Sequence, residues 1–150
     1  MNLELIGSVF VASIGSGLLP FLNAEVILGA AVVASPSDLW PLTIASSIGQ
    51  MVSKALLYAL ARWVPDRLPA RARKAMDKAS SRVEKVRAGG WGLVFVSSLT
   101  GFPPFYIVSL AAGVVKLPLA GFLVGGTAGR IIRFALIAYG TVAIGEAVTG

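Results

Sequence analysis

An apolar run from Leu5 to Val33 is broken near its middle, and this break constrains the fold more than any other feature of the sequence. Pro20, Asn23 and Glu25 stand inside the run, where a helix that faces lipid should carry none of them. Each of the two pieces is shorter than the roughly 20 residues that a helix needs to cross a bilayer. The run therefore predicts a re-entrant hairpin over residues 5–33, which enters the membrane and returns to the same side with its tip at Pro20.

The composition is that of an integral membrane protein. Of the 150 residues, 56% are hydrophobic and only 13% are charged, a balance outside the range of ordinary soluble domains. The sequence contains no cysteine and no histidine, which excludes disulfides, thiolate nucleophiles and the usual zinc and haem ligands. We therefore expect no metal, no cofactor and no enzymatic activity.

The positive charge is concentrated in one segment. Nine basic and three acidic residues lie between Arg62 and Arg87, and they account for the whole net charge of +6. A single basic loop in an apolar chain follows the positive-inside rule and is not the pattern of a nucleic-acid-binding protein. Residues 64–90 are therefore predicted to lie in the cytoplasm, with the chain in the inner (plasma) membrane.

Within this loop, apolar residues recur at steps of three and four over residues 66–88. This spacing predicts a basic amphipathic helix that lies on the cytoplasmic leaflet or beneath the other helices. A solvated charged loop is the alternative, because the apolar stripe relies partly on alanines.

Two other stretches are long enough to cross the bilayer. Residues 39–63 carry a tryptophan near each end, as is typical of the two membrane interfaces, and residues 118–148 form the second stretch. Between them, residues 91–115 form another broken apolar run, which is interrupted by Pro103 and Pro104. Its pieces are again too short to span, so this run predicts a second re-entrant hairpin.

The two halves of the chain follow one plan. Pro20 and Gly29 of the first half match Pro104 and Gly113 of the second half at the same offset of 84 residues. Each half holds one hairpin and one crossing segment, so the second half starts on the opposite side of the membrane from the first. This arrangement brings two hairpins together near the midplane, as in many transporters.

The predicted fold is therefore a single all-α membrane domain that occupies the whole chain. It is built as an inverted repeat of two units, each a re-entrant helical hairpin followed by one transmembrane helix. The first repeat covers residues 1–63, the second covers residues 91–150, and the basic amphipathic helix joins them.

Glu25 is the first candidate for chemistry, because carboxylates inside the membrane usually have a function. If Glu25 is buried, it is either paired with a cation or protonated, and a carboxyl that switches between these states suits proton coupling. If the hairpin is shallow, Glu25 instead lies in water. Asn23 could line the same site, but its position just before a helical piece favours an N-cap.

Polar side chains in the crossing segments form a second group of candidates. Gln50 and Lys54 are four residues apart and share a helix face, although Lys54 could also reach the headgroups by snorkelling. Arg130 and Arg133 share a face near mid-membrane, where an arginine needs a partner or water. Its planar guanidinium suits a carboxylate or a phosphate. We expect these side chains to bind substrate, with purely structural pairing to Glu25 as the alternative.

Tyr106, like Tyr58 and Tyr139, could donate a hydrogen bond to a headgroup. Tyrosine in membrane proteins is, however, more often interfacial or packed.

A stripe of small residues in the last crossing segment predicts close helix packing. The partner could be another helix of this chain or a second copy of it. The stripe consists of Gly121, Gly125 and Gly129.

One set of residues spread over both halves suggests a family. It consists of Pro20 with Glu25 and Gly29, Gly49-Gln50 with Tyr58 and Arg62, Ala112-Gly113, and Gly129-Arg130 with Arg133-Phe134. Over nearly its whole length the chain resembles the DedA family, also called the VTT or SNARE-associated Golgi protein domain. The resemblance implies two facing re-entrant hairpins and the movement of lipids across membranes. These lipids are polyprenyl-phosphate carriers in bacterial members and phospholipids in eukaryotic relatives.

The chain departs from the family pattern at two places. Members typically have arginines beside the proline of the second hairpin and often an acid after the glycine of the first crossing helix. This chain has no arginine between Leu99 and Phe105, and it has Gln50 at the second place. Anion recognition would then rest on half-helix N-termini or on Arg130 and Arg133.

The combined expectation is an integral membrane transporter or scramblase that moves an anionic lipid headgroup between leaflets. Arg130, Arg133 and Lys54 would bind the headgroup, with Glu25 as gate or proton site. The expected partners are anionic membrane lipids and no nucleic acid, and assembly of several copies is left open. A small-ion or solute transporter and a non-transporting membrane scaffold are the alternatives.

Overall fold

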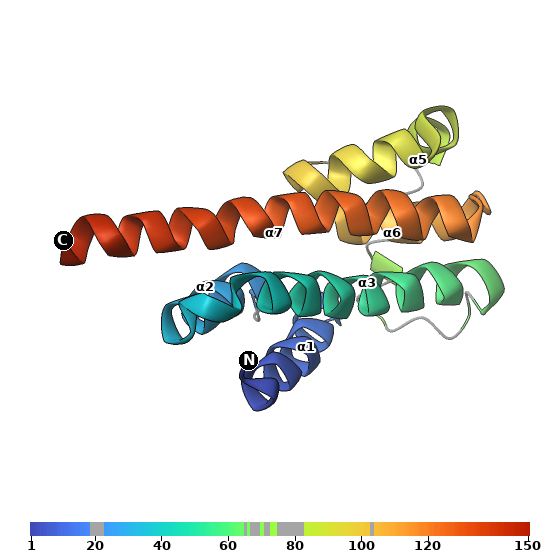
Figure 1. Cartoon of the computed structure of the whole chain (residues 1–150). Helices are drawn as coiled ribbons and strands as arrows, with labels where there is room; N and C mark the ends of the chain where they lie inside the picture. Colours follow the sequence, from blue (N-terminus) through green and yellow to red (C-terminus); the bar gives the residue numbers. More distant parts are fainter. Residues whose placement is uncertain (19–22, 65, 67–69, 71–72, 75–82, 103) are drawn as a thin grey trace. The chain divides into compact units, whose positions relative to one another are not determined.

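Every regular element in the described part of the chain is a helix (Figure 1), which confirms the predicted all-α class. The structure is a computed structural model, and it describes all residues except 19–22, 65, 67–69, 71–72, 75–82 and 103. In chain order the elements are α1 (Leu3–Leu18), α2 (Ala24–Ala34), the short 3-10 helix η1 (Pro36–Asp38), α3 (Leu39–Trp63), α5 (Val83–Thr100), α6 (Phe105–Val114) and α7 (Leu119–Thr149).

The two broken apolar runs fold as pairs of short helices. α1 packs against α2, and α5 packs against α6. The second helix of each pair starts just after an N-cap residue with a non-helical backbone conformation. These N-caps are Asn23 for α2 (φ −111°, ψ 112°) and Pro104 for α6 (φ −54°, ψ 126°). The predicted tip at Pro20 and the neighbouring Pro103 lie outside the described residues. Insertion of these pairs into the membrane as re-entrant hairpins stays a prediction.

α3 and α7 are the long apolar helices of the structure. Both are long and apolar enough to cross a membrane, whereas α1, α2 and α6 are shorter apolar helices. α3 has the bounds of the first predicted crossing segment, and α7 is shifted by one residue from the second. Length and hydropathy are properties of contiguous sequence, so these two segments could be located without knowledge of any tertiary contact.

The predicted amphipathic helix over residues 66–88 lies mostly outside the described residues. The described part starts again with α5 at Val83, and this helix is interrupted at Gly90 (φ 54°, ψ −145°). A residue with a side chain rarely adopts this backbone conformation, so glycine at this position lets the chain change direction. The break lies just after residue 88, where the predicted amphipathic helix ends.

The chain divides into two compact units, which are described separately below. The first unit contains residues 1–53 and 130–150, and the second contains residues 54–129. Each unit holds one pair of short helices, the first part of the long helix that follows this pair, and the last part of the other long helix. The two units are thus built from corresponding parts.

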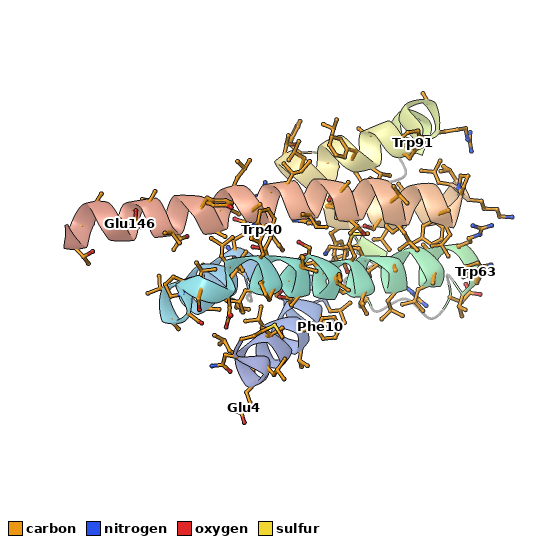
Figure 2. All side chains as sticks on the ribbon, in the orientation of Figure 1. Glu4, Phe10, Trp40, Trp63, Trp91 and Glu146 are labelled. Atoms are coloured by element: carbon orange, nitrogen blue, oxygen red, sulfur yellow. The ribbon has the colours of Figure 1, made fainter. Side chains whose placement is uncertain are left out.

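The first unit has an apolar core between α2, α3 and α7. Leu28 and Val32 of α2 are fully buried there with Leu42 of α3 and Phe134 of α7. Near the start of α3, Trp40 (labelled in Figure 2) packs edge to face against Tyr139 of α7, with the ring centroids 5.9 Å apart. These contacts hold α2 against the two long helices through side chains.

In the first unit, α1 docks closely on α3 at a glycine. A Cβ built on Gly49 would lie 2.6 Å from the carbonyl oxygen of Phe10 and 2.9 Å from Cβ of Ser13, so a side chain at position 49 would collide with α1. The Ser13 and Ser46 hydroxyls form a buried hydrogen bond of 3.0 Å beside this contact. Small residues and hydroxyl pairs of this kind are the usual means of close helix packing in membranes.

The second unit has the corresponding contact between α5 and α7. A Cβ on Gly129 would lie 2.8 Å from both the carbonyl oxygen of Phe95 and Cβ of Ser98. The Ser98 hydroxyl donates a 2.5 Å hydrogen bond to the carbonyl oxygen of Gly126. The other two glycines of the predicted stripe, Gly121 and Gly125, face Trp91 of α5. The stripe therefore packs against α5 of this chain.

The junction between α6 and α7 is fixed by backbone and side-chain hydrogen bonds. The amide of Lys116 donates to the carbonyl oxygen of Gly113, and the amide of Leu117 donates to that of Ala112, which is the Schellman pattern of a helix end. The hydroxyl of Tyr58 and Nη1 of Arg62 on α3 both donate to the carbonyl oxygen of Leu117. α3 thereby holds the turn in place.

Lys116 occupies the left-handed position of this turn (φ 57°), where glycine is usual. Replacing Lys116 by glycine should raise the free energy of unfolding by up to about 1 kcal/mol, because relief of the left-handed conformation, about 1–2 kcal/mol, exceeds the roughly 0.4–1 kcal/mol by which glycine stabilises the unfolded chain. Thermal unfolding in detergent would measure this change. A lower stability would show that the strain at Lys116 is smaller than the conformational entropy that glycine adds to the unfolded chain.

Candidate functional site

Asn23 sets the position of the only acidic residue on α2. Its Oδ1 atom accepts a 2.9 Å hydrogen bond from the backbone amide of Glu25, which is the capping arrangement that its sequence position predicts. Glu25 therefore lies in the first turn of α2. A carboxylate is stabilised at this end of a helix by the helix dipole.

Glu25 pairs with Arg133 of α7, and the pair is the central feature of the first unit. Nε of Arg133 donates a 2.5 Å hydrogen bond to Oε1 of Glu25, and Nη2 of Arg133 contacts the same oxygen. The side chains of Arg133 and Glu25 are 27% and 33% exposed, respectively. The pair is therefore accessible from outside the fold, which is the condition for exchange with an external anion or proton.

Arg130 lies one turn before Arg133 on α7, within the first unit. Its guanidinium carbon is 5.8 Å from the ring centroid of Phe134, which is fully buried. The side chain is only partly exposed. One carboxylate thus accompanies two guanidinium groups at this place, and the local excess of one positive charge favours an anion.

Gln50 of α3 serves the packing of α1. Its Nε2 atom donates a 2.7 Å hydrogen bond to the hydroxyl of Ser16 and a longer one, of 3.4 Å, to the carbonyl oxygen of Ser13. The side chain is almost completely buried. This position, where an acid was expected from the family pattern, therefore holds α1 against α3, and a role of Gln50 in transport stays a prediction.

Lys54 and Tyr106 come together in the second unit. The Lys54 ammonium lies 5.2 Å from the centroid of the Tyr106 ring, which is within the range of a cation–π interaction. Lys54 is 6% exposed, so its side chain lies inside the fold, and the snorkelling alternative stays untested. Two of the predicted site residues, one on α3 and one on α6, are thus in contact.

The anchoring role of Tyr58 and Arg62 was not apparent from the sequence. Their spacing of four residues places them on one helix face, and Nη1 of Arg62 also donates to the Tyr58 hydroxyl. The acceptor that they share is a backbone carbonyl, that of Leu117. A carbonyl has no signature in the sequence, so this part of the arrangement could only be found in the structure.

A second fixed junction precedes α3. The Asp38 carboxylate accepts hydrogen bonds from the backbone amide of Asn2 (2.8 Å) and from the hydroxyl of Ser35 (3.0 Å). Asp38 is 5% exposed. It joins the start of α1 to the turn between α2 and α3.

Comparison with known proteins supports a family assignment. No curated protein and no solved structure gives a significant match to the chain. The family model described as the VTT domain matches residues 19–142, a range that includes α2, α3, α5, α6 and α7 as far as residue 142, and with them Glu25, Arg130 and Arg133. The chain belongs to the VTT domain family, the DedA or SNARE-associated Golgi protein domain, and is a membrane protein of that family.

Proposed function

We propose that this chain is a membrane transporter that moves an anionic lipid headgroup, such as that of a polyprenyl phosphate or a phospholipid, between the two leaflets. The observation that carries the proposal is the partly exposed pair of Glu25 and Arg133, in which Glu25 lies at the start of a short apolar helix. Ionisable groups at such a place in a membrane protein are usually part of a substrate or ion path.

The charges favour an anion as the substrate. Arg130 adds a second guanidinium beside the pair, and the described residues of α1, α2 and α7 before Glu146 offer only Glu4 and Glu25 as acids. A phosphate could replace the Glu25 carboxylate on Arg133, because a guanidinium binds both groups through the same planar set of donors. Protonation of Glu25 would also release its carboxylate from Arg133, and transport could be coupled to protons in this way.

The proposed architecture is an inverted repeat with two re-entrant hairpins. Its support is the corresponding construction of the two units, including the glycine contacts at Gly49 and Gly129. The broken helices would then form the substrate path, as in other transporters with such repeats. We also propose that residues 64–90 face the cytoplasm in the inner membrane, on the strength of their positive charge.

Lys54 and Tyr106 would contribute to this path from the second unit. The Lys54 side chain is buried against the Tyr106 ring, which holds its ammonium in place. Lys54 would thus meet the same headgroup at another stage of its passage.

The scaffold alternative loses part of its basis. It relied on the stripe of Gly121, Gly125 and Gly129 as a surface for a partner, and these glycines pack against α5. A transporter of a small anionic solute would use the same charges, so the assay below includes that outcome.

The experiment is a translocation assay in proteoliposomes with a labelled polyprenyl phosphate, a labelled zwitterionic phospholipid and, in a third arm, inorganic phosphate. We expect the wild-type chain to move the anionic lipid faster than empty liposomes do, and the Arg130→Gln variant to lose about tenfold in initial rate. Arg87→Gln, an exposed residue of the basic segment, should leave the rate unchanged.

Each outcome of this assay has a definite reading. If inorganic phosphate moves and neither lipid does, the substrate is a small anionic solute and not a lipid. Movement of neither lipid nor phosphate above the empty liposomes would contradict the proposed transport.

A further inference from the structure

The two short helices at corresponding places, α2 and α6, are held by different kinds of contact. Seven of the ten residues of α6 are buried, against four of the eleven residues of α2. The matched glycines of these helices, Gly113 and Gly29, show the same difference. The comparison concerns the contacts inside each unit.

α6 is held against the backbone of α3. A Cβ on Gly113 would overlap the carbonyl oxygen of Tyr58, and it would lie 3.2 Å from the backbone nitrogen of Arg62. Two helices that touch backbone to backbone cannot slide along each other without a collision, because no side chain can move out of the way. The hydrogen bonds from Tyr58 and Arg62 to Leu117 then fix the C-terminal end of α6 as well.

α2 is held by side chains that can change conformation. Among the described residues, a Cβ on Gly29 would meet only the hydroxyl of Thr141, at an ordinary distance of 3.6 Å. The core contacts of α2 come from apolar side chains such as Leu28 and Val32. On its other side, residues of α1 and α2 line an open apolar groove of about 400 Å³ beside the contact between these two helices. A specific polar contact of α2 with α7 is the pair of Glu25 and Arg133.

We propose that α2 is the moving short helix of this protein, latched to α7 by Glu25 and Arg133, and that α6 is the fixed one. Loss of the latch lets α2 shift along α7 and toward the groove, since rotamer changes of apolar side chains suffice for this movement. The same loss leaves α6 in place, because neither its backbone contact nor its anchored end depends on Glu25. This asymmetry holds whether or not the chain transports lipid.

The test measures distances between pairs of spin labels in the full chain, reconstituted in liposomes. The sequence has no cysteine, so labelled cysteines can be introduced without removing native ones. One pair, at the exposed residues Val33 and Leu136, joins α2 to α7, and the other, at the exposed residues Val114 and Leu56, joins α6 to α3. We expect Glu25→Gln to broaden the first distance distribution about twofold and to leave the second unchanged.

Two further measurements keep the result interpretable. Glu4→Gln, which neutralises an exposed acid on α1, should change neither distribution, and circular dichroism should show that each variant retains its helix content. In the unsubstituted chain, the α2 pair should already be broader than the α6 pair. Equal widths of the two pairs in that chain, or equal broadening of both by Glu25→Gln, would overturn the proposal.

Discussion

Replacing Gly113 by alanine should destabilise the protein strongly, by about 1–3 kcal/mol, as overpacking of a close contact does. The added methyl group would overlap the carbonyl oxygen of Tyr58 and would lie 2.9 Å from Cβ of Ala61. Alanine also favours the helix by roughly 1 kcal/mol over glycine, so the observed loss is what remains after this gain. Unfolding in detergent, followed by circular dichroism during titration with a denaturing surfactant, would measure it.

Gly29→Ala is the matched control, because Gly29 and Gly113 hold corresponding places in the two halves. A methyl group at position 29 would lie 3.6 Å from the Thr141 hydroxyl, an ordinary contact distance. The gain in helix propensity should then prevail, and the stability should stay unchanged or rise by up to about 1 kcal/mol. Equal losses for the two alanine variants would contradict the difference between α2 and α6 on which the further inference rests.

The positions of the helices could largely be read from the sequence. α3 was located by the length of an apolar stretch between two tryptophans, and the start of α2 by Asn23 before a helical piece. These signals are local: a stretch is long enough to span or it is not, and a capping side chain bonds to an amide two residues away. Local signals survive in the sequence because they need no partner from elsewhere.

The contacts between helices could be foreseen only as alternatives. Glu25 and Arg133 are separated by 108 residues, and pairing between them was one of two readings of these charges. The partner of the stripe at Gly121, Gly125 and Gly129 was likewise open until α5 was found beside it. Close packing of glycine depends on the backbone opposite, which the sequence does not specify at a distance.

The difference between the two halves was the least predictable feature. Gly29 and Gly113 look equivalent in the sequence, but Gly113 meets a backbone carbonyl and Gly29 meets a hydroxyl. An internal repeat predicts that two segments share a fold, and it does not predict that they share the strength of their contacts. The departure from symmetry arises from the residues on the long helices that face each glycine.

Exchange of the two charges at positions 25 and 133 should have the second large effect. Arg133→Glu alone places two acids side by side, and Glu25→Arg alone places an additional guanidinium beside Arg130 and Arg133, so each single variant should lose stability and transport. The double variant Glu25→Arg, Arg133→Glu restores an ion pair. It should recover most of the stability, less a cost of about 0.3–1 kcal/mol for a cation at the start of α2.

Translocation of labelled polyprenyl phosphate by this double variant distinguishes a structural ion pair from a substrate site at Glu25 and Arg133. Glu146→Gln, an exposed acid far along α7, serves as the control and should transport at the wild-type rate. We expect the double variant to be folded and to transport the lipid at least about tenfold more slowly than wild type, because the cation has moved from α7 to α2. A folded double variant that transports the lipid at the wild-type rate would contradict a substrate site at Glu25 and Arg133.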